Sequence, residues 1–459
     1  MATSGVTGGS QIDVQTLVSQ LVAAERKPLD DQVARATTKV ATQISATSAL
    51  LGAMSSFQSS LNNLKTTTAF SSRTTSSTDT SILTASASTS AVPGRYDVVV
   101  DRLASAQQIS SDAFAQGSTQ VVGTGTLNIS LGASSFSVNI ASPANTLADI
   151  RNAINAATDN PGVTATLINA ADGAHLVLTS SKTGATNAIQ VTQSGGNGGL
   201  ASLTYGTGNL DNYTQLRPAQ DSRVYLAGQY EATSSTNVID GVIEGVSLNL
   251  VSAEPGETVS IDVSFDKTAA KQKVSAFVAA YNTLRGMMTR LGGYDSASKT
   301  AGPMLGDSLL SSIDSEIRRT LSNPVEGAGT AIQTLADIGV TTQKDGTLKV
   351  DDTKLESALN GNFDSVARLF GTANTGVAAR LYDQVTARLA DGAGIDQRND
   401  SLQAEQRVLA KKTADINTRM QIVQQAYLKQ FTRLDTLLSS LSSTSAYLSQ
   451  QIEALSNNK

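Results

Sequence analysis

The 459-residue chain holds 34 lysines and arginines against 39 acidic residues, a net charge of −5 at neutral pH. Nucleic-acid binding needs a basic face, and the only notable basic motif, Lys411-Lys412, is expected to be solvated, so we predict no nucleic-acid partner. No stretch approaches the roughly 18 consecutive apolar residues of a membrane span, so we also predict no membrane insertion.

The inventory of reactive side chains argues against catalysis. The chain has no cysteine and one histidine, His175, which follows a turn and lies in an apolar segment. Disulfides, cysteine-ligated zinc and the usual nucleophile–histidine triads are therefore excluded. Adjacent acids at Asp30-Asp31 and Asp351-Asp352 point apart on a helix or strand, so neither makes a convergent carboxylate pair. We predict no enzyme, no cofactor and no metal site, and a structural role for His175.

The N-terminal region has a helical pattern. A short amphipathic stripe is expected to end near Pro28, since proline breaks a helix interior. No proline follows before Pro93, and a second apolar row runs through this gap. The stripe consists of Val14, Leu17, Val18 and Leu21, with Val22 beside them, and the row consists of Val33, Val40, Thr47, Met54 and Leu61.

The middle of the chain predicts β-structure after a Ser/Thr-rich linker at 71–81. Alternating and β-branched segments bounded by turn residues indicate ten strands. They are expected at 83–90, 96–100, 126–131, 135–140, 163–169, 175–180, 188–192, 224–226, 246–251 and 259–265. One helix interrupts them, with Asn145 as its N-cap and a stop at Asn160-Pro161-Gly162.

From about Lys267 the helical period returns, with a second helix at 305–321 and a capping-box pattern at 353–356. Residues 401–459 contain neither glycine nor proline. Their apolar residues interleave at spacings of three and four, which predicts a coiled coil. One seam runs through Leu402, Leu409, Ile416, Val423 and Leu437, and the other through Met420, Tyr427, Leu434, Leu441, Leu448 and Leu455.

Two apolar helices, one from each end, indicate that the termini pair with each other, although an ordinary bundle core would give a similar pattern. We predict an α+β multidomain fold: a discontinuous helical, coiled-coil stalk from both termini with an inserted β-rich head of two domains. The terminal leg comprises 1–40 and 411–459, the helical stalk 41–77 and 267–410, the first head domain 78–115 and 217–266, and the second 116–216. Interruptions by Thr, Gln and Ser suggest that the leg orders only against partners.

Several short motifs, in order along nearly the whole chain, resemble the flagellar filament cap family, hook-associated protein 2. The opening motif runs from Ile12-Asp13 to Pro28-Leu29, and Ala91-Val92-Pro93-Gly94-Arg95-Tyr96 is similar to the start of the family's β region. Residues 146–192 resemble the insertion motif of hook-associated proteins. Further matches lie at Phe277-Val278, Leu305-Gly306-Asp307-Ser308, Asp337-Ile338-Gly339-Val340, Gln430-Phe431 and Leu434-Asp435.

This resemblance implies a structural cap at the distal tip of the flagellar filament that promotes ordered folding and polymerisation of flagellin. It implies a closed homo-oligomeric ring, contacts with flagellin and with the hook-associated junction proteins, and a cytoplasmic export chaperone on the C-terminal helix. The chain would be secreted by the flagellar type III system, in keeping with an N-terminus that lacks the pattern of a cleaved signal peptide. The expected surface for flagellin or chaperone is the coiled-coil seam from both ends of the chain. It consists of Val14, Leu17, Val18, Leu21, Val33 and Val40 near the N-terminus and of Met420, Val423, Tyr427, Leu434, Leu437, Leu441, Leu448 and Leu455 near the C-terminus.

Three other interpretations stay open at this point. The chain could be another axial protein, a flagellin or a hook–filament junction protein. It could bind host glycans as an adhesin through residues 116–216, alone or in addition to capping. The third is an enzyme carried on an axial scaffold, for which no motif argues.

Overall fold

The computed structural model describes residues 13–206 and 212–456, with the side chains of 455 and 456 also outside the description. The chain forms two compact units. The helical unit combines the chain up to Ala69 with the chain from Lys271 onward, and the β unit comprises Phe70–Ala270. No helix within the described ranges combines the length and the apolar character needed to cross a membrane.

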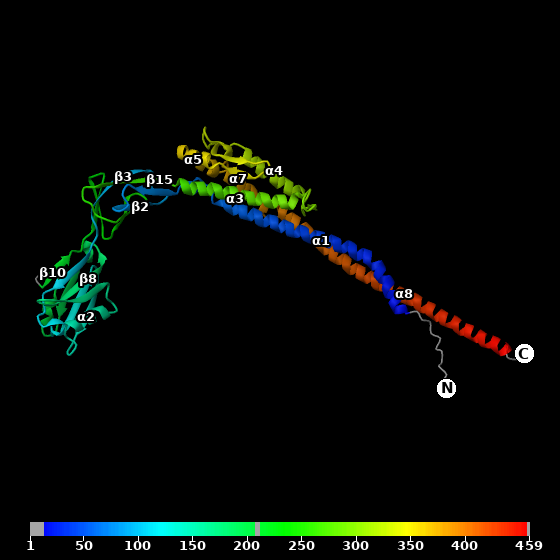
Figure 1. Cartoon of the computed structure of the whole chain (residues 1–459), viewed down its shortest axis with the longest axis horizontal. Coiled ribbons are helices and arrows are strands. Elements are labelled where there is room, and N and C mark those ends of the chain that lie inside the picture. The colour runs from blue at the N-terminus through cyan, green and yellow to red at the C-terminus, as the bar shows by residue number, and fades with distance from the viewer. Residues whose placement is uncertain (1–12, 207–211, 457–459) are drawn as a thin grey trace. The chain divides into compact units, whose positions relative to one another are not determined.

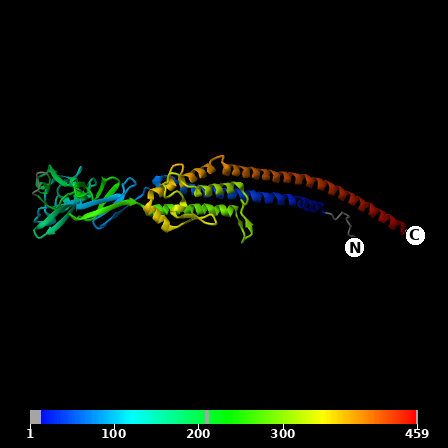
Figure 2. The ribbon, with the colours of Figure 1, turned by 90° about the horizontal axis from the view of Figure 1, so that it is seen from above.

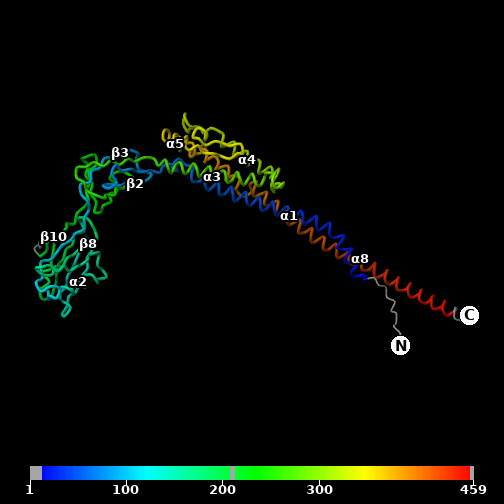
Figure 3. Tube along the Cα trace, viewed as in Figure 1, coloured from blue at the N-terminus to red at the C-terminus, as the bar shows by residue number. Residues whose placement is uncertain are grey.

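Two long helices, α1 (Val14–Asn62) and α8 (Gly394–Ser456), dominate the helical unit (Figures 1 and 3). Asp13 caps α1 by accepting a hydrogen bond from the Thr16 amide at 3.0 Å. The 63 residues of α8 correspond to a length of about 95 Å at the usual rise per residue. The helix begins at Gly394, seven residues before the predicted residue 401.

The prediction that the first helix ends near Pro28 is wrong, because α1 continues through this residue. An interior proline removes one backbone hydrogen bond and costs about 3 kcal/mol. Apolar residues on both sides of it, Val22 and Leu29, pack with Val33 against α8. This shared burial holds the two halves of α1 in one line, as tertiary packing commonly overrides local propensity.

The remaining helices build an aromatic core around the C-terminal half of α1. The Phe57 ring lies 6.3 Å from both Phe277 and Tyr281, and Phe277 lies 5.5 Å from Phe370, centroid to centroid. The helices are α3 (Lys267–Gly292), α4 (Ser308–Ser322), α5 (Asp352–Gly361), α6 (Phe363–Gly371) and α7 (Val377–Leu389). Two hairpins join them: β16 (Tyr294–Asp295) with β17 (Thr300–Ala301), and β18 (Val340–Thr342) with β19 (Leu348–Val350).

The first part of the β unit is an antiparallel sandwich. A five-stranded sheet, β1-β15-β3-β11-β12, packs on a three-stranded sheet, β13-β14-β2, around a core that includes Val98, Leu248 and Ile261. The strands are β1 (Arg73–Ser77), β2 (Leu83–Ala87), β3 (Gly94–Arg102), β11 (Ser222–Leu226), β12 (Tyr230–Ser234), β13 (Val238–Ile243), β14 (Val246–Leu250) and β15 (Thr258–Phe265).

The second part has its own core, built from two further antiparallel sheets, β10-β4-β8-β7 and β6-β5-β9, and the helix α2 (Leu147–Ala156). Ile109, Ile129 and Ile150 are fully buried in it. The strands are β4 (Ala106–Ser111), β5 (Gly125–Leu131), β6 (Ser134–Ile140), β7 (Val163–Ala170), β8 (Gly173–Thr183), β9 (Ile189–Ser194) and β10 (Tyr213–Arg217). Short 3₁₀ turns lie at η1 (Thr67–Phe70), η2 (Gly117–Thr119), η3 (Ala185–Asn187), η4 (Gly199–Leu203) and η5 (Leu335–Ile338).

Three local expectations need correction. Residues 73–77 form β1 and pair with β15 rather than serving as a linker, and the β unit begins at Phe70. The N-cap of α2 is Thr146, not Asn145, because a capping box joins Thr146 to Asp149. The capping box expected at 353–356 is replaced by a single cap from Asp351, whose carboxylate accepts from the Lys354 amide at 3.1 Å.

Candidate functional site: the terminal helix pair

The helices α1 and α8 run antiparallel. Val33 packs against Ile416 and Met420, while Val40 packs against Leu402 and Leu409, so rising numbers in α1 meet falling numbers in α8. Two polar contacts between the helices follow the same register. The Arg26 guanidinium donates to the Asn417 side-chain oxygen at 2.7 Å, and the Tyr427 hydroxyl donates to the Glu25 carboxylate at 3.3 Å.

The structure brings most of the candidate residues of α1 to this pair. Val18, Val33 and Val40 are buried, and Val14 and Leu17 are half-buried. Leu21 is 37% exposed and lies at the edge of the stripe. On α8, Met420 is buried, while Val423 and Tyr427 are half-buried.

The distal members of the predicted set are different, because they stay in solvent. Leu434, Leu437, Leu441 and Leu448 are 43%, 56%, 57% and 54% exposed. The side chain of Leu455 lies outside the described residues. In Figures 1 and 2 the red end of α8 continues past the blue start of α1. Beyond about residue 438, this exposed stripe therefore has no α1 residue of the described chain opposite it.

Sequence reasoning missed three exposed apolar residues on the same stretch. Leu438, Tyr447 and Ile452 are 36%, 61% and 65% exposed. They lie outside the two expected seams, so the heptad pattern gave no reason to include them. With them, the exposed apolar surface of α8 becomes broader than a two-helix seam.

A groove of about 580 Å³ runs along one flank of α8 where this stretch begins. We call it the α8 groove. Among the described residues it is lined by Ala426, Lys429, Gln430, Arg433, Leu434 and Leu437. The mixture of two cations and two leucines is suited to binding a polypeptide surface rather than to chemistry.

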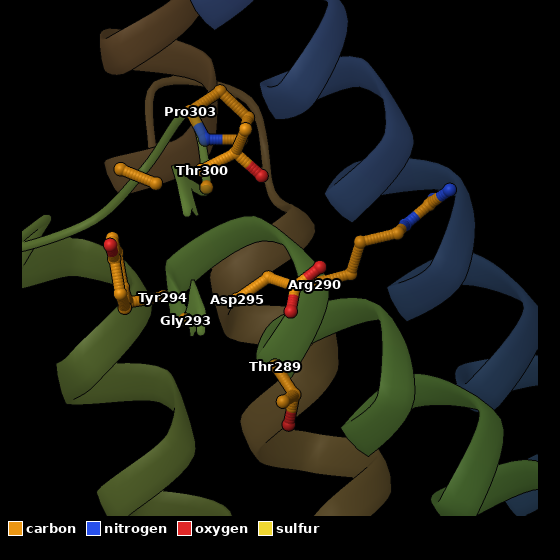
Figure 4. A pocket seen from close by; sticks show the side chains of 9 residues that line it. Thr289, Arg290, Gly293, Tyr294, Asp295, Thr300 and Pro303 are labelled. Atoms are coloured by element: carbon orange, nitrogen blue, oxygen red, sulfur yellow. The ribbon is translucent and has the colours of Figure 1, made fainter. Parts of the chain in front are cut away.

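A second hollow, of about 420 Å³, lies at the end of α3 beside the β16–β17 hairpin (Figure 4). Its charged groups are already used locally. The Arg290 guanidinium contacts the Met287 sulfur, and the Asp295 carboxylate accepts from the Ala297 amide and the Ser298 hydroxyl. These hydrogen bonds, that of Ser298 first, lower the pKa of Asp295. The hollow therefore presents a turn and no free acid or base.

The acid pairs do not converge. Asp30 binds Arg26 at 2.7 Å, and the Asp31 carboxylate binds Lys27 at 3.2 Å. Asp351 caps α5, whereas Asp352 pairs with Lys271 at 3.0 Å. Within the described ranges, no three acidic or histidine side chains gather closely enough to hold a metal ion.

His175 has a structural environment. Its Nδ1 lies 2.7 Å from the Ser111 carbonyl oxygen, and its Nε2 lies 3.1 Å from the Asp172 carboxylate. The Ser111 bond, followed by the Asp172 bond, raises the pKa of His175 above its ordinary value of 6.5. Two acceptors thus fix the ring between β8 and the end of β4.

Comparison with known proteins identifies the family. The model described as Flagellar hook-associated protein 2 C-terminus matches residues 219–443, and the corresponding N-terminus model matches residues 10–107. The chain is also 33% identical to the A-type flagellar hook-associated protein 2 of Pseudomonas aeruginosa, over 99% of this chain and 98% of the relative. The chain belongs to the flagellar hook-associated protein 2 family. A Flagellin hook IN motif also matches, at residues 126–182.

Other members of the hook-associated protein 2 family agree with this assignment. The Escherichia coli K12 protein of that name is 29% identical over 98% of each chain. A crystal structure of the flagellar cap protein FliD D1-D2-D3 domains from Escherichia coli superposes with a TM-score of 0.59 at 28% identity, over 78% of this chain and 99% of that one. The resemblance and the α+β multidomain fold with helical ends are confirmed. The family is that of a structural flagellar cap protein.

Proposed function

We propose that this chain caps the distal tip of a flagellar filament and promotes the ordered folding and polymerisation of exported flagellin. One observation supports this best: the apolar seam of α8 is buried against α1 up to Met420 and exposed from Leu434 to Leu448. A helix whose seam is half covered can bind a second helical chain without giving up its first contact. No covalent step is needed.

The open half offers enough apolar surface for a reversible contact. Burying a leucine completely stabilises a complex by about 1.5–3 kcal/mol. Leu434, Leu437, Leu441 and Leu448 are already about half covered, so each adds roughly 1 kcal/mol on binding. Much of this gain is offset by the lost freedom of the two helices. The resulting contact would be weak enough to break and reform as each flagellin subunit is added.

The test replaces Leu437, Leu441 and Leu448 together with serine in a strain that lacks the native gene. We expect unpolymerised flagellin in the medium and a loss of swarming. Ile422→Ser is the matched control, because Ile422 is 63% exposed on another face of the same helix. Normal filaments in the triple variant, with protein levels unchanged, would contradict the proposed role of the seam.

The proposed assembly is a closed homo-oligomeric ring, since a cap must cover a tube. The four-part division of leg, stalk and two head domains described above remains our proposal for how the ring is built. Light scattering over a concentration series should show self-association of the purified chain. A monomer at every concentration would argue against autonomous ring formation.

We further propose a cytoplasmic export chaperone that covers the exposed stripe of α8 before secretion through the flagellar type III system. An uncovered apolar stripe otherwise favours self-association. Deleting residues 430–459 should abolish co-purification of the chaperone while leaving the β unit folded. Contacts with flagellin and with the hook-associated junction proteins would then form outside the cell.

The distal part of α8 is expected to order fully only against such partners. Hydrogen exchange on the isolated chain should show rapid exchange beyond about residue 438 and slower exchange around Ile416 and Met420, which are buried. Strong protection of residues 438–456 in a monomer would contradict this view.

A further inference from the structure

The α8 groove has a defined charge pattern in addition to its leucines. Lys429 and Arg433 line it four residues apart, so they lie on one side of the helix. Neither makes an ion pair or a hydrogen bond with any residue that the structure describes. The two like charges repel each other at this spacing. An acidic side chain from a bound partner would reduce this repulsion and so stabilise the complex.

Further along the helix, the surface beside the groove is apolar and uncharged. From Thr436 to Ile452 the sequence holds no charged residue. Leu437, Leu441 and Leu448 continue from the groove, each more than half exposed. The surface thus has a cationic end and an apolar end, in that order along α8.

We propose that the α8 groove binds an amphipathic helix of another protein, with two acidic side chains opposite Lys429 and Arg433 and apolar residues opposite Leu437 and Leu441. This inference rests on the proposed function, because it specifies the chemistry of the partner that the open seam receives. The charges give the contact its direction and specificity, and the leucines give most of its affinity.

Charge complementarity favours a different chain over a second copy of this one. The distal part of α8 has no acid between Asp435 and Glu453. On α1, Asp30 and Asp31 are already paired with Arg26 and Lys27. A second copy that laid its own residues 436–452 against the groove would therefore bring no acid, and Asp30 or Asp31 would first have to leave its own partner.

The test uses three synthetic helical peptides with a fluorescent label and the full-length protein. The first has leucines at spacings of three and four and two glutamates four residues apart. The second has lysines in place of the glutamates, and the third keeps the glutamates but has serines in place of the leucines. Fluorescence anisotropy at low and high salt gives Kd for each peptide.

We expect the acidic peptide to bind about tenfold more tightly than the basic one, since two exposed ion pairs replace two repulsive contacts. High salt should narrow this difference, and the serine peptide should bind weakly at both salt concentrations. Lys429→Glu combined with Arg433→Glu should reverse the preference. Lys411→Glu combined with Lys412→Glu is the matched control. It changes the net charge by the same amount on an exposed part of α8 and should leave the preference for the acidic peptide unchanged.

Equal affinity for the acidic and basic peptides, or a preference that survives the charge reversal, would overturn the inference. Sedimentation of the full chain tests the other occupant: a dimer that the charge reversal abolishes and that competes with the acidic peptide would identify a second copy instead. Circular dichroism confirms that each variant keeps its helix content. The peptide experiment can fail while the proposed cap function holds. The variant with serine at positions 437, 441 and 448 tests filament growth and leaves Lys429 and Arg433 unchanged.

Discussion

Replacing His175 with glutamine should remove a pH-dependent part of the stability of the β unit. The Ser111 carbonyl and the Asp172 carboxylate can only accept hydrogen bonds. Both ring nitrogens of His175 must therefore carry a proton to satisfy both partners, at 2.7 and 3.1 Å. The folded state thus favours the charged imidazolium, in agreement with the raised pKa of His175.

The sign of the pH effect follows from that direction. A group whose pKa is raised by folding stabilises the folded state fully below its unfolded pKa, about 6.5 for histidine. This stabilisation is lost as the pH rises through the higher pKa of the folded state. The nearby acids Asp172 and Asp112 both favour the charged ring, so the effect should be confined to the neutral and mildly alkaline range.

The magnitude can be bounded from the geometry. Hydrogen bonds to charged groups contribute about 1.5–3 kcal/mol. The His175 side chain is 20% exposed, so we expect the lower end of that range, about 1.5 kcal/mol. Solvent screens the contribution of the Asp172 contact to stability, because Asp172 is 65% exposed. The free energy of unfolding should therefore fall by about 1.5 kcal/mol more in the native chain than in His175→Gln between pH 5.5 and 8.5.

Because His175 is the only histidine of the chain, a single titrating imidazole signal in NMR reports its pKa directly, provided that the purification tag contains no histidine. Urea unfolding of the full chain, followed by circular dichroism at both pH values, gives the free energies. Asp172→Asn is the control: it should lower the pKa partway while retaining the Ser111 bond. A pKa at or below 6.5, or equal pH dependence in the native chain and His175→Gln, would refute the reasoning.

Four further substitutions test the packing. Tyr213 is buried and its hydroxyl has no partner in the described part of the chain, so Tyr213→Phe should leave the free energy of unfolding unchanged or raise it by up to about 1 kcal/mol, measured by urea unfolding. Met420→Ala should destabilise the helix pair by about 2 kcal/mol, whereas Leu441→Ala should change stability by less than about 0.5 kcal/mol, both measured by hydrogen exchange in α1. Pro28→Ala restores a backbone hydrogen bond and should slow exchange at the N-terminal end of α1 by about tenfold or more; faster exchange would mean that proline stabilises this helix.

The heptad seams predicted the pairing of the chain ends because an apolar stripe that repeats over many helical turns is typical of a helix packed along a partner helix. The same pattern could not show where burial stops. Leu437 and Leu441 continue the seams as regularly as Ile416 does, yet only Ile416 is covered. The difference depends on where the antiparallel partner begins, which is a property of the tertiary arrangement.

Three of the strands that were not predicted have a related cause. The segments β4, β10 and β12 are rich in polar residues such as Ser, Thr and Gln, so the alternation of apolar and polar residues is weak, and backbone pairing with neighbouring strands holds them in place. The helix start at Thr146 was displaced by one residue because Asn145 is an equally suitable N-cap by type. The reciprocal bond from Asp149 decides between them. Pairing between segments thus selects the strands, whereas a side-chain contact within the first turn of α2 selects the helix start.

The unequal lengths of the two long helices connect the fold to the proposed function. The described start of α1 is Val14, and the register of the pair places this end near the middle of the leucines of α8. Beyond about residue 438, α8 continues to Ser456 as a serine-rich stretch without a described partner helix. Most of the stability of a helix in a protein comes from packing against neighbours, and serine does not favour the helix strongly by itself. The apolar residues of this stretch therefore stabilise the helix only when another chain covers them. Because Val33 and Val40 are buried elsewhere along the helix pair, the stretch can exchange one partner for another without disturbing their contacts.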